Sequence, residues 1–271
     1  MGRLWIKRMS LSARQLQRYA RNIALAQVGE AGQEILSHSR VLVVGAGGLG
    51  SAAAFYLAAA GVGTLGLMDD DTVDLSNLQR QILYGAADVG KSKVNQAKAT
   101  LQALEPDLNV EAYAARLTPA NALDILRRYD FVVDATDTFR SKFLIADACH
   151  FAGKPYSHAA VLALDGQTMT VIPGETTCFR CVFGEPPPPG AVPSSAEVGV
   201  LGALPGVMGT IQATEAIKYC LRAGKALTNR LLRYDALSMT FREVPVRRSE
   251  DCPLCGANPS ITALRDADAS A

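Results

Sequence analysis

The sequence predicts an α/β protein whose doubly wound, mainly parallel sheet is extended by antiparallel strands. Short apolar runs, typical of strands buried on both faces, alternate with helical periodicity through the first half of the chain. A glycine-rich turn follows the first apolar run directly. The second half contains period-two alternation, which indicates antiparallel strands. We therefore expect a single domain over residues 1–271, with flexible termini at about 1–10 and 257–271 and a loop at about 184–197.

The individual elements can be predicted in chain order. Residues 10–37 have helical spacing, with Ser12 as a candidate N-cap. Short apolar runs predict strands over 41–44, 65–68, 109–115 and 131–134. The segments between and after them have helical character over 49–60, 92–104, 119–129 and 141–152.

The second half of the chain has a different pattern. AVLALDGQTMTVIPG and LLRYDALSMTFREVPV contain the alternating segments that predict antiparallel strands. Between them, EPPPPGAVPSS is too rich in proline for regular structure, and a helix is expected over 207–221.

Composition excludes some classes of function. The formal net charge of the 271 residues is +1, so the chain lacks the strongly basic character of a general nucleic-acid binder. The most apolar run, residues 49–62, is shorter than the roughly 20 residues of a membrane-spanning helix. The basic start has no apolar core after it. We therefore expect no secretory signal, a start at Met1 or Met9, and a cytoplasmic location.

Gly45, Gly47 and Gly50 form a GxGxxG motif between a predicted strand and a predicted helix. Glycines in this context let a phosphate approach the backbone, and the helix start offers free N–H groups. Asp69 ends the next strand, at a spacing suited to ribose hydroxyls. These features predict a Rossmann-like nucleotide site, with a ligand-free glycine turn as the structural alternative.

Polar residues at predicted strand ends and helix starts indicate which nucleotide is bound. Asn77 and Arg80 follow Asp69 within one short segment, Lys93 opens a helix, and Asp137 follows a strand. A nicotinamide dinucleotide needs no such additional charge, whereas a triphosphate needs cations and a carboxylate that can hold Mg²⁺. The pattern favours ATP over an NAD-dependent oxidoreductase, which remains the alternative enzyme. A non-catalytic carrier-binding scaffold is the alternative without chemistry.

Eight motifs occur in an order that resembles one known family. They are VLVVGAGGLGS, DDDTVDLSNLQRQ, DVGKSK, VVDATD, CFRC, GVMGTIQATEAIK, LLRYDA and CPLCG. Together, over roughly residues 12–256, they resemble the bacterial ubiquitin-activating-like adenylyltransferases of the ThiF/MoeB/HesA type. The resemblance implies a homodimer that uses ATP and Mg²⁺ to activate the C-terminal Gly-Gly carboxylate of a small ubiquitin-like (β-grasp) sulfur carrier. The pathways implied are molybdopterin, thiamine or tRNA thiolation, with a sulfurtransferase or cysteine desulfurase as a further partner.

The resemblance also implies a role for each site residue. The nucleotide would be surrounded by Gly45, Gly47 and Gly50, and Asp69 would hold the ribose. The phosphates would be contacted by Asn77, Arg80 and Lys93, and Asp137 would bind Mg²⁺. Arg21, assisted by Arg18, would reach the ATP of the partner subunit.

Two positions depart from the family pattern. An arginine usually follows the Asp137 turn; here the segment reads Thr138, Phe139, Arg140, Ser141, Lys142, and Lys142 is the candidate replacement. Ser195 stands where some members have a nucleophilic cysteine. Either the enzyme stops at the adenylate, or the serine is an engineered replacement that traps the carrier.

The cysteines predict a metal site. Cys178 with Cys181, and Cys252 with Cys255, form two CxxC pairs, which suit structural zinc; four buried or disulfide-linked thiols are the alternative. Cys149 and Cys220 are expected in the core. Of the histidines, His38 is expected at the surface, His150 in a helix, and His158 at a strand start near the site.

Overall fold

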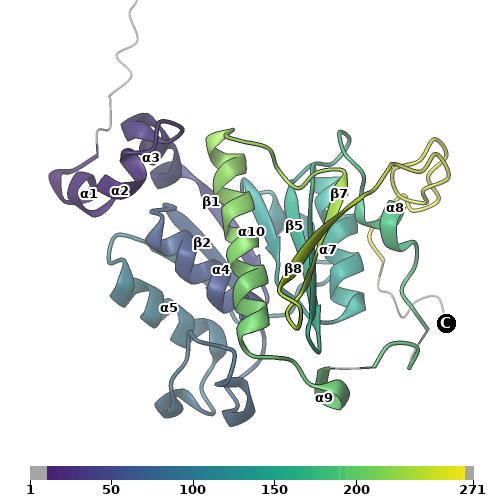
Figure 1. The fold of residues 1–271 in the computed structure, drawn as a ribbon, viewed down its shortest axis with the longest axis horizontal. Coiled ribbons are helices and arrows are strands. Elements are labelled where there is room, and N and C mark those ends of the chain that lie inside the picture. Colours follow the sequence, from purple (N-terminus) through teal and green to yellow (C-terminus); the bar gives the residue numbers. More distant parts are fainter. Residues whose placement is uncertain (1–10, 189, 194, 266–271) are drawn as a thin grey trace, which may run out of the picture.

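One eight-stranded sheet forms the centre of the protein (Figure 1), with strand order β3-β2-β1-β4-β5-β6-β7-β8. The computed structural model describes residues 11–188, 190–193 and 195–265. The expected flexible residues 1–10, the alternative start at Met9 and residues 266–271 lie outside this range. The chain order of the strands reverses where β1 lies between β2 and β4, so this is the switch point at which α/β sheets bind ligands.

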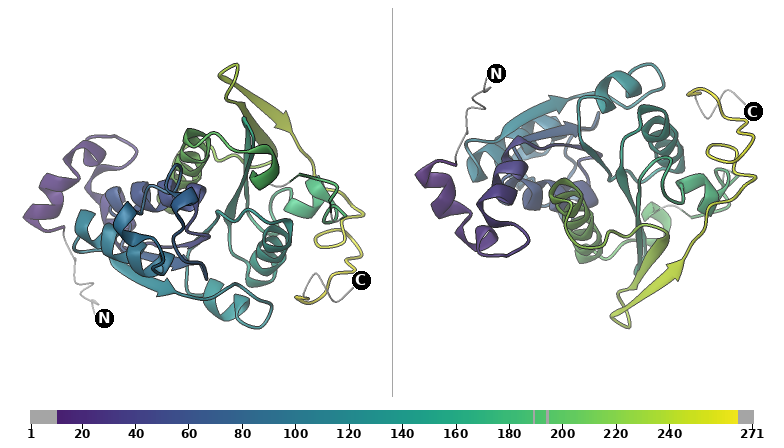
Figure 2. Two further views of the ribbon diagram at one scale, coloured as in Figure 1. Left: turned by 90° about the horizontal axis from the view of Figure 1, so that it is seen from below. Right: turned by 90° about the horizontal axis from the view of Figure 1, so that it is seen from above.

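The sheet confirms the predicted fold class. Its first five strands in chain order are parallel, and they are β1 (Arg40–Val44), β2 (Thr64–Met68), β3 (Asn109–Tyr113), β4 (Phe131–Asp134) and β5 (Tyr156–Leu162). The antiparallel extension consists of β6 (Asp165–Val171), β7 (Arg230–Asp235) and β8 (Thr240–Pro245). The β7–β8 hairpin extends away from the body of the molecule (Figure 2).

Helices cover both faces of the sheet, as a doubly wound fold requires. One face is covered by α4 (Gly48–Ala59), α5 (Lys93–Leu104) and α10 (Ala203–Leu221), and the other by α6 (Ala122–Leu126) and α7 (Phe139–Ala152). Figure 2 shows α10 and α7 on opposite sides of the sheet. Along β1, Val41 and Val43 belong to one core cluster, and Leu42 and Val44 belong to the other. Alternate residues of a strand point to opposite faces, so an apolar run buries both.

The N-terminal segment differs from the single helix predicted over 10–37. It forms α1 (Ala13–Arg18), α2 (Ala20–Ile23) and α3 (Gly29–His38). Ser12 caps α1, as expected, by accepting the backbone N–H of Gln15. The first break comes at Tyr19, whose ring is buried and whose hydroxyl donates to Glu105 at 2.8 Å. Gly29, with φ of +58°, begins α3. Docking of Tyr19 against the body interrupts the helical periodicity.

Shorter elements complete the fold. They are the 3-10 turns η1 (Leu75–Asn77) and η2 (Ala86–Asp88), and the helices α8 (Phe179–Phe183) and α9 (Ser195–Val198). The proline-rich segment ends in α9, and Ser195 is the first residue of that helix. Residues 257–265 form neither helix nor strand, but Ile261 packs against the core and donates its N–H to the Pro253 carbonyl at 2.9 Å.

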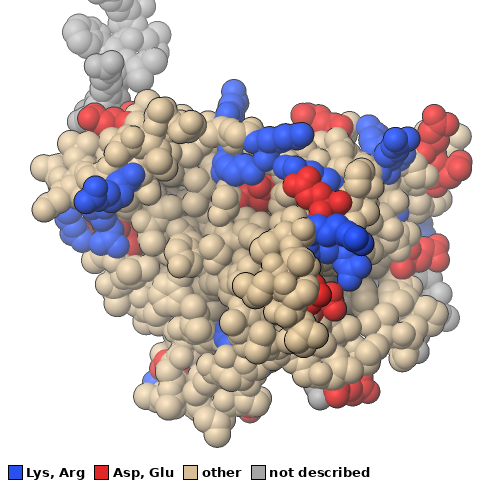
Figure 3. Space-filling model, viewed as in Figure 1, with Lys and Arg blue, Asp and Glu red and all other residues tan. Residues whose placement is uncertain are grey.

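The surface carries charges of both signs. On the face in Figure 3, Lys and Arg side chains are interleaved with Asp and Glu along the upper edge, and the centre of the face has few charges. This agrees with the formal net charge of +1. No helix in the described part of the chain combines the length and the apolar character that a membrane crossing requires.

Glu111 on β3 is the centre of a polar cluster at the edge of the sheet. It accepts hydrogen bonds from Arg40, Arg128, Tyr113 and Tyr129 at 2.7 to 2.9 Å. Burial alone would raise the pKa of the Glu111 carboxyl, but the bonds from Arg40, Tyr129 and Tyr113 lower it from 4.5 to about 2.

Glu111→Gln should therefore destabilise the protein in a pH-dependent way. The folded-state pKa of Glu111 lies below the unfolded value, so the stabilisation is present above about pH 4.3 and is lost as the pH falls toward 2. At pH 7 we expect the free energy of unfolding to fall by about 1–3 kcal/mol. Denaturant unfolding at pH 7 and pH 3 measures this, and an equal loss at both pH values would contradict it.

Candidate active site

A cavity of about 570 Å³ opens at the switch point of the sheet. It lies at the carboxyl ends of β1, β2 and β4 and is also lined by the first turns of α4, α5 and α10. Residues predicted from widely separated parts of the chain meet there, namely Gly45, Gly47, Asp69, Arg80, Lys93 and Asp137. Gly50, Asn77 and Arg21, also predicted as site residues, are not among its lining residues.

The three glycines of the motif have different roles. Gly45 has φ of +94°, and a Cβ there would lie 2.6 Å from the Ala135 carbonyl oxygen. A Cβ at Gly50 would lie 1.9 Å from the Gly45 oxygen, so Gly50 packs α4 onto the turn and does not face the cavity. A Cβ at Gly47 would have the Gln81 Nε2 as its nearest neighbour, at 3.7 Å. Only Gly47 is therefore free of a protein contact that requires glycine.

Asp69 is held against the glycine turn. One of its carboxylate oxygens accepts the Ala46 N–H at 2.8 Å, and the other accepts the Asp71 N–H at 2.9 Å. The buried hydroxyl of Tyr84 donates to the Ala46 carbonyl at 2.7 Å. These bonds join the ends of β1 and β2 into one rigid wall of the cavity.

Three cationic side chains on the cavity are held by oxygen acceptors. Lys93 is buried, and its Nζ lies 2.9 Å from an oxygen of Asp71. Arg80 donates to the Ser76 carbonyl at 3.1 Å, and Arg116 pairs with Asp70. Sequence reasoning missed Arg116, although its place just beyond the end of β3 is a signal of the kind that identified Asp69.

An unpaired buried oxygen also borders the cavity. Gln81 is buried, and its Oε1 has no hydrogen-bond partner among the described residues. A buried polar atom without a partner costs free energy, which a ligand that offers a donor would remove. The cavity is therefore suited to a polar ligand.

Carboxylates reach the cavity from two strand ends. Asp137 lies exposed in the turn after β4. Asp69, Asp70 and Asp71 follow β2 and place carboxylate oxygens within 4.8 Å of one another, a group that does not include Asp137. Hard oxygen ligands of this kind suit Mg²⁺.

Asn77 lies in η1, the turn that leads to Arg80. Its side-chain oxygen accepts the Asp74 N–H at 3.3 Å, and Asp74 in turn accepts the Ser76 N–H. This reciprocal cap orders the segment between β2 and Arg80. In this chain the geometry gives Asn77 a role in shaping the turn, and not a place on the cavity wall.

Arg18 and Arg21 lie far from the cavity of their own chain. Arg18 donates to the Leu104 carbonyl at 2.7 Å and pairs with Glu105, at the C-terminal end of α5. Lys93 begins the same helix, and a rise of about 1.5 Å per residue separates the two ends by about 16 Å. Arg21 lies exposed on α2, the next turn after Arg18.

The turn after Asp137 leads into α7, whose first residues include two cations with different surroundings. Arg140 lines the cavity, whereas Lys142 is buried and donates to Asp134 and to the Ala159 carbonyl. Arg140 and Lys142 are two positions apart in α7, so their side chains lie on different sides of the helix. Lys142 stays the candidate replacement for the family's arginine, and Arg140 is the residue of this pair that lines the cavity.

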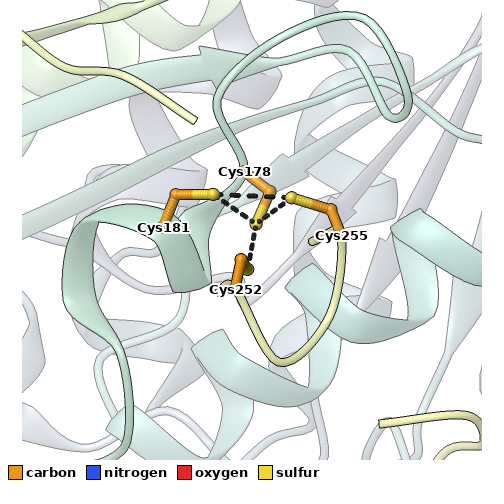
Figure 4. A group of neighbouring side chains, drawn as sticks. All are labelled: Cys178, Cys181, Cys252 and Cys255. Carbon is orange, nitrogen blue, oxygen red and sulfur yellow. Dashed lines mark hydrogen bonds between the residues drawn. The ribbon is translucent and has the colours of Figure 1, made fainter. Parts of the chain in front are cut away.

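The four predicted metal ligands form one cluster (Figure 4). Cys178 immediately precedes α8 and Cys181 lies within it. Cys252 and Cys255 come from the C-terminal segment. Their sulfur atoms lie 3.3–3.5 Å apart along the cluster. Tetrahedral zinc, with Zn–S bonds of about 2.3 Å, requires sulfur separations of about 3.8 Å. The cluster is compatible with zinc after a small outward movement.

The remaining cysteines and histidines lie where the sequence predicted. Cys149 is buried in the core cluster beside α7, and Cys220 packs against the cluster on the other face of the sheet. His38 is exposed and His150 lies in α7. His158 is buried on β5.

Comparison with known proteins identifies the family. A model of the ThiF family matches residues 19–254. The chain belongs to the ThiF family. It is 48% identical over 260 residues to the SAMP-activating enzyme E1 of Haloferax volcanii, covering 96% of each chain. It is 49% identical over 266 residues to the sulfur carrier protein adenylyltransferase of Thermus thermophilus, covering 96% of this chain and 98% of that one.

Solved structures agree on the fold of this ThiF-family chain. The crystal structure of E. coli MccB with ATP superimposes with a TM-score of 0.76 at 23% identity, covering 88% of this chain and 74% of that one. The family match confirms the resemblance that the motifs indicated. The names of the relatives favour nucleotidyl transfer over the oxidoreductase alternative.

Gly47→Ala should separate ligand binding from folding. A Cβ at this position has 3.7 Å of room and φ is −81°, so we expect the free energy of unfolding to change by about 1 kcal/mol or less. The methyl group would project toward the cavity and should weaken ATP binding about tenfold or more. Gly45→Ala and Gly50→Ala are the controls, and each should lower stability by more than about 2 kcal/mol. Thermal unfolding and ATP titration measure both effects, and wild-type ATP affinity in Gly47→Ala would contradict the assignment.

Proposed function

We propose that this chain uses ATP to adenylate the C-terminal Gly-Gly carboxylate of a small ubiquitin-like sulfur-carrier protein. The convergence of the glycine turn, Arg80, Lys93 and Asp137 on one cavity of a ThiF-family chain carries the proposal. Cations and the N-terminus of α4 at the same cavity suit a triphosphate. Relatives named SAMP-activating enzyme E1 and sulfur carrier protein adenylyltransferase support the class of protein substrate.

The reaction asks for positioning and charge stabilisation. A carboxylate oxygen of the carrier attacks the α-phosphorus of ATP, the bond to the bridging oxygen breaks, and the products are the acyl-adenylate and pyrophosphate. Lys93 and Arg80 would exchange their present acceptors, Asp71 and the Ser76 carbonyl, for phosphate oxygens. Arg140, at the start of α7, would add a further cation.

We assign Mg²⁺ to the carboxylates of the cavity. When bound, the ion would neutralise charge on the triphosphate. Asp137 is the principal candidate ligand, because it is exposed at the cavity and follows a rigid strand end. Asp70 is paired with Arg116, and Asp71 is paired with Lys93. These two aspartates could therefore coordinate the ion only after those ion pairs open.

The remote position of Arg21 supports a homodimer with shared sites. Arg21 lies on α2, three residues beyond Arg18, and Arg18 is anchored about 16 Å from Lys93 along α5. Arg21 would therefore act on the nucleotide of the partner subunit.

Adenylation transfers no sulfur, so a sulfurtransferase or cysteine desulfurase would act after this enzyme, in the cytoplasm.

We also propose that the four cysteines hold structural zinc. Four thiolates leave no open position for a substrate, so the ion would link α8 to the C-terminal segment. The N–H of Ser249 lies 3.4 Å from the Cys181 sulfur, a donor contact that suits a thiolate.

Variants of Asp137 and Arg21 test the shared site. Asp137→Ala and Arg21→Ala should each abolish ATP–pyrophosphate exchange that depends on β-grasp proteins ending in Gly-Gly, without loss of folding. A mixture of the two inactive proteins should recover activity, because each mixed dimer has one complete site. Random pairing makes about half of the dimers mixed, so recovery should reach about a quarter of wild-type activity.

Each outcome of that experiment has a distinct meaning. Full exchange by Asp137→Ala would sink the assignment of Asp137. No recovery on mixing would place Arg21 outside the partner's site. No ATP consumption by the wild type with any β-grasp protein would sink the proposed function itself.

Zinc should be measurable and necessary for stability. Wild-type protein purified without chelators should contain about one zinc per chain by elemental analysis. Cys252→Ser should lose the metal and at least about 2 kcal/mol of stability, which corresponds to about 4 °C or more in melting temperature. Cys220→Ser is the matched control and should keep the metal. A wild-type protein free of zinc would overturn the assignment.

A further inference from the structure

The turn that presents Asp137 is shaped by the side chain of Asp134. One carboxylate oxygen of Asp134 accepts the N–H of Thr136 at 3.1 Å and its hydroxyl at 2.7 Å. Asp134 itself is buried, with 1% of its surface exposed. The orientation of this buried carboxylate therefore determines the course of the chain between β4 and Asp137.

The other oxygen of Asp134 is held from the interior of the protein. His158 places its Nδ1 3.0 Å away, and Lys142 places its Nζ 3.3 Å away. Lys142 is also held in place by the Ala159 carbonyl, at 2.6 Å. Four donors thus orient the carboxylate, and two of them come from outside its own turn.

The protonation states follow from burial and charge. Burial would raise the pKa of the Asp134 carboxyl, but Lys142 and His158 lower it to about 2. Burial and the Lys142 charge lower the pKa of His158 to about 4, so its ring is neutral near pH 7. A carboxylate only accepts hydrogen bonds, and the single ring proton therefore lies on Nδ1.

The rest of the His158 ring gains nothing from being histidine. Its Nε2 is buried without a hydrogen-bond partner in the described part of the chain, which costs free energy. The ring packs edge-on against Phe179 and Phe183 of α8, with centroids 4.7 and 5.7 Å apart. Phenylalanine would make that contact equally well without the unpaired nitrogen. The Nδ1–H donor is what requires histidine here.

We propose that His158 is a positioning residue for the magnesium-binding turn. Through its Nδ1–H it holds Asp134 in the orientation that binds Thr136, and so sets the position of Asp137 at the cavity. The inference rests on the proposed function, because it takes Asp137 as a ligand of Mg²⁺.

Two substitutions separate the donor from the ring. His158→Asn keeps an N–H where Nδ1 lies and loses the ring; His158→Phe keeps the ring and loses the donor. The readout is the Mg²⁺ concentration that half-saturates binding of α,β-methylene-ATP to the intact protein. We expect His158→Phe to raise this concentration about tenfold and His158→Asn to stay within about threefold of wild type. The exposed His38→Asn is the control and should have no effect.

The outcomes distinguish this inference from the function on which it rests. Equal effects in His158→Phe and His158→Asn, or none in His158→Phe, would overturn it, because the ring or neither feature would then matter. A wild type without Mg²⁺-dependent nucleotide binding would instead overturn the proposed function.

If His158→Phe does not fold, Thr136→Val removes a donor from the other oxygen of Asp134 at a partly exposed position. It should produce the same tenfold change, and a wild-type value would overturn the inference.

Discussion

The parallel pairing of β1 with β2 and β4 is the constraint on which the cavity depends. Val44 is in register with Met68 on one side and with Asp134 on the other. Three strands therefore end along one line, and the chain leaves each of them toward the same space. The glycine turn, the aspartates after β2 and the turn after β4 are side by side for this reason. The two apolar cores, one on each face of the sheet, hold this register.

The charged groups around the cavity fall into two layers. Lys93, Arg80 and Asp137 face the cavity, where a ligand can replace their present partners. Behind them, Asp134 and Lys142 are buried and fully committed to each other and to their neighbours. Burying charges is costly unless each one is paired and hydrogen-bonded, and this inner layer meets that condition. It provides a rigid base from which the exposed carboxylate reaches the cavity.

The cysteine cluster extends this order beyond the parallel sheet. It joins α8 to a C-terminal segment that has no helix or strand of its own. Phe179 of α8 packs against the His158 ring, and His158 donates to Asp134. The C-terminal segment that carries Cys252 and Cys255 is far from the cavity wall in sequence, but contacts between side chains connect the two. Leu254 of this segment is buried and Ile261 packs against the same core cluster, so apolar contacts also hold the segment in place.

The sequence alone predicted the order of the strands along the chain, most of the helices between them and the residues at the strand ends. These predictions depend on local rules: apolar runs predict buried strands, and polar residues after parallel strands meet at one edge. It did not predict the break at Tyr19, because that break comes from a contact with Glu105. The packing role of Gly50 and the place of Arg140 on the cavity wall also depended on distances between remote segments. Such distances follow from how whole elements pack, which no local pattern in the sequence specifies.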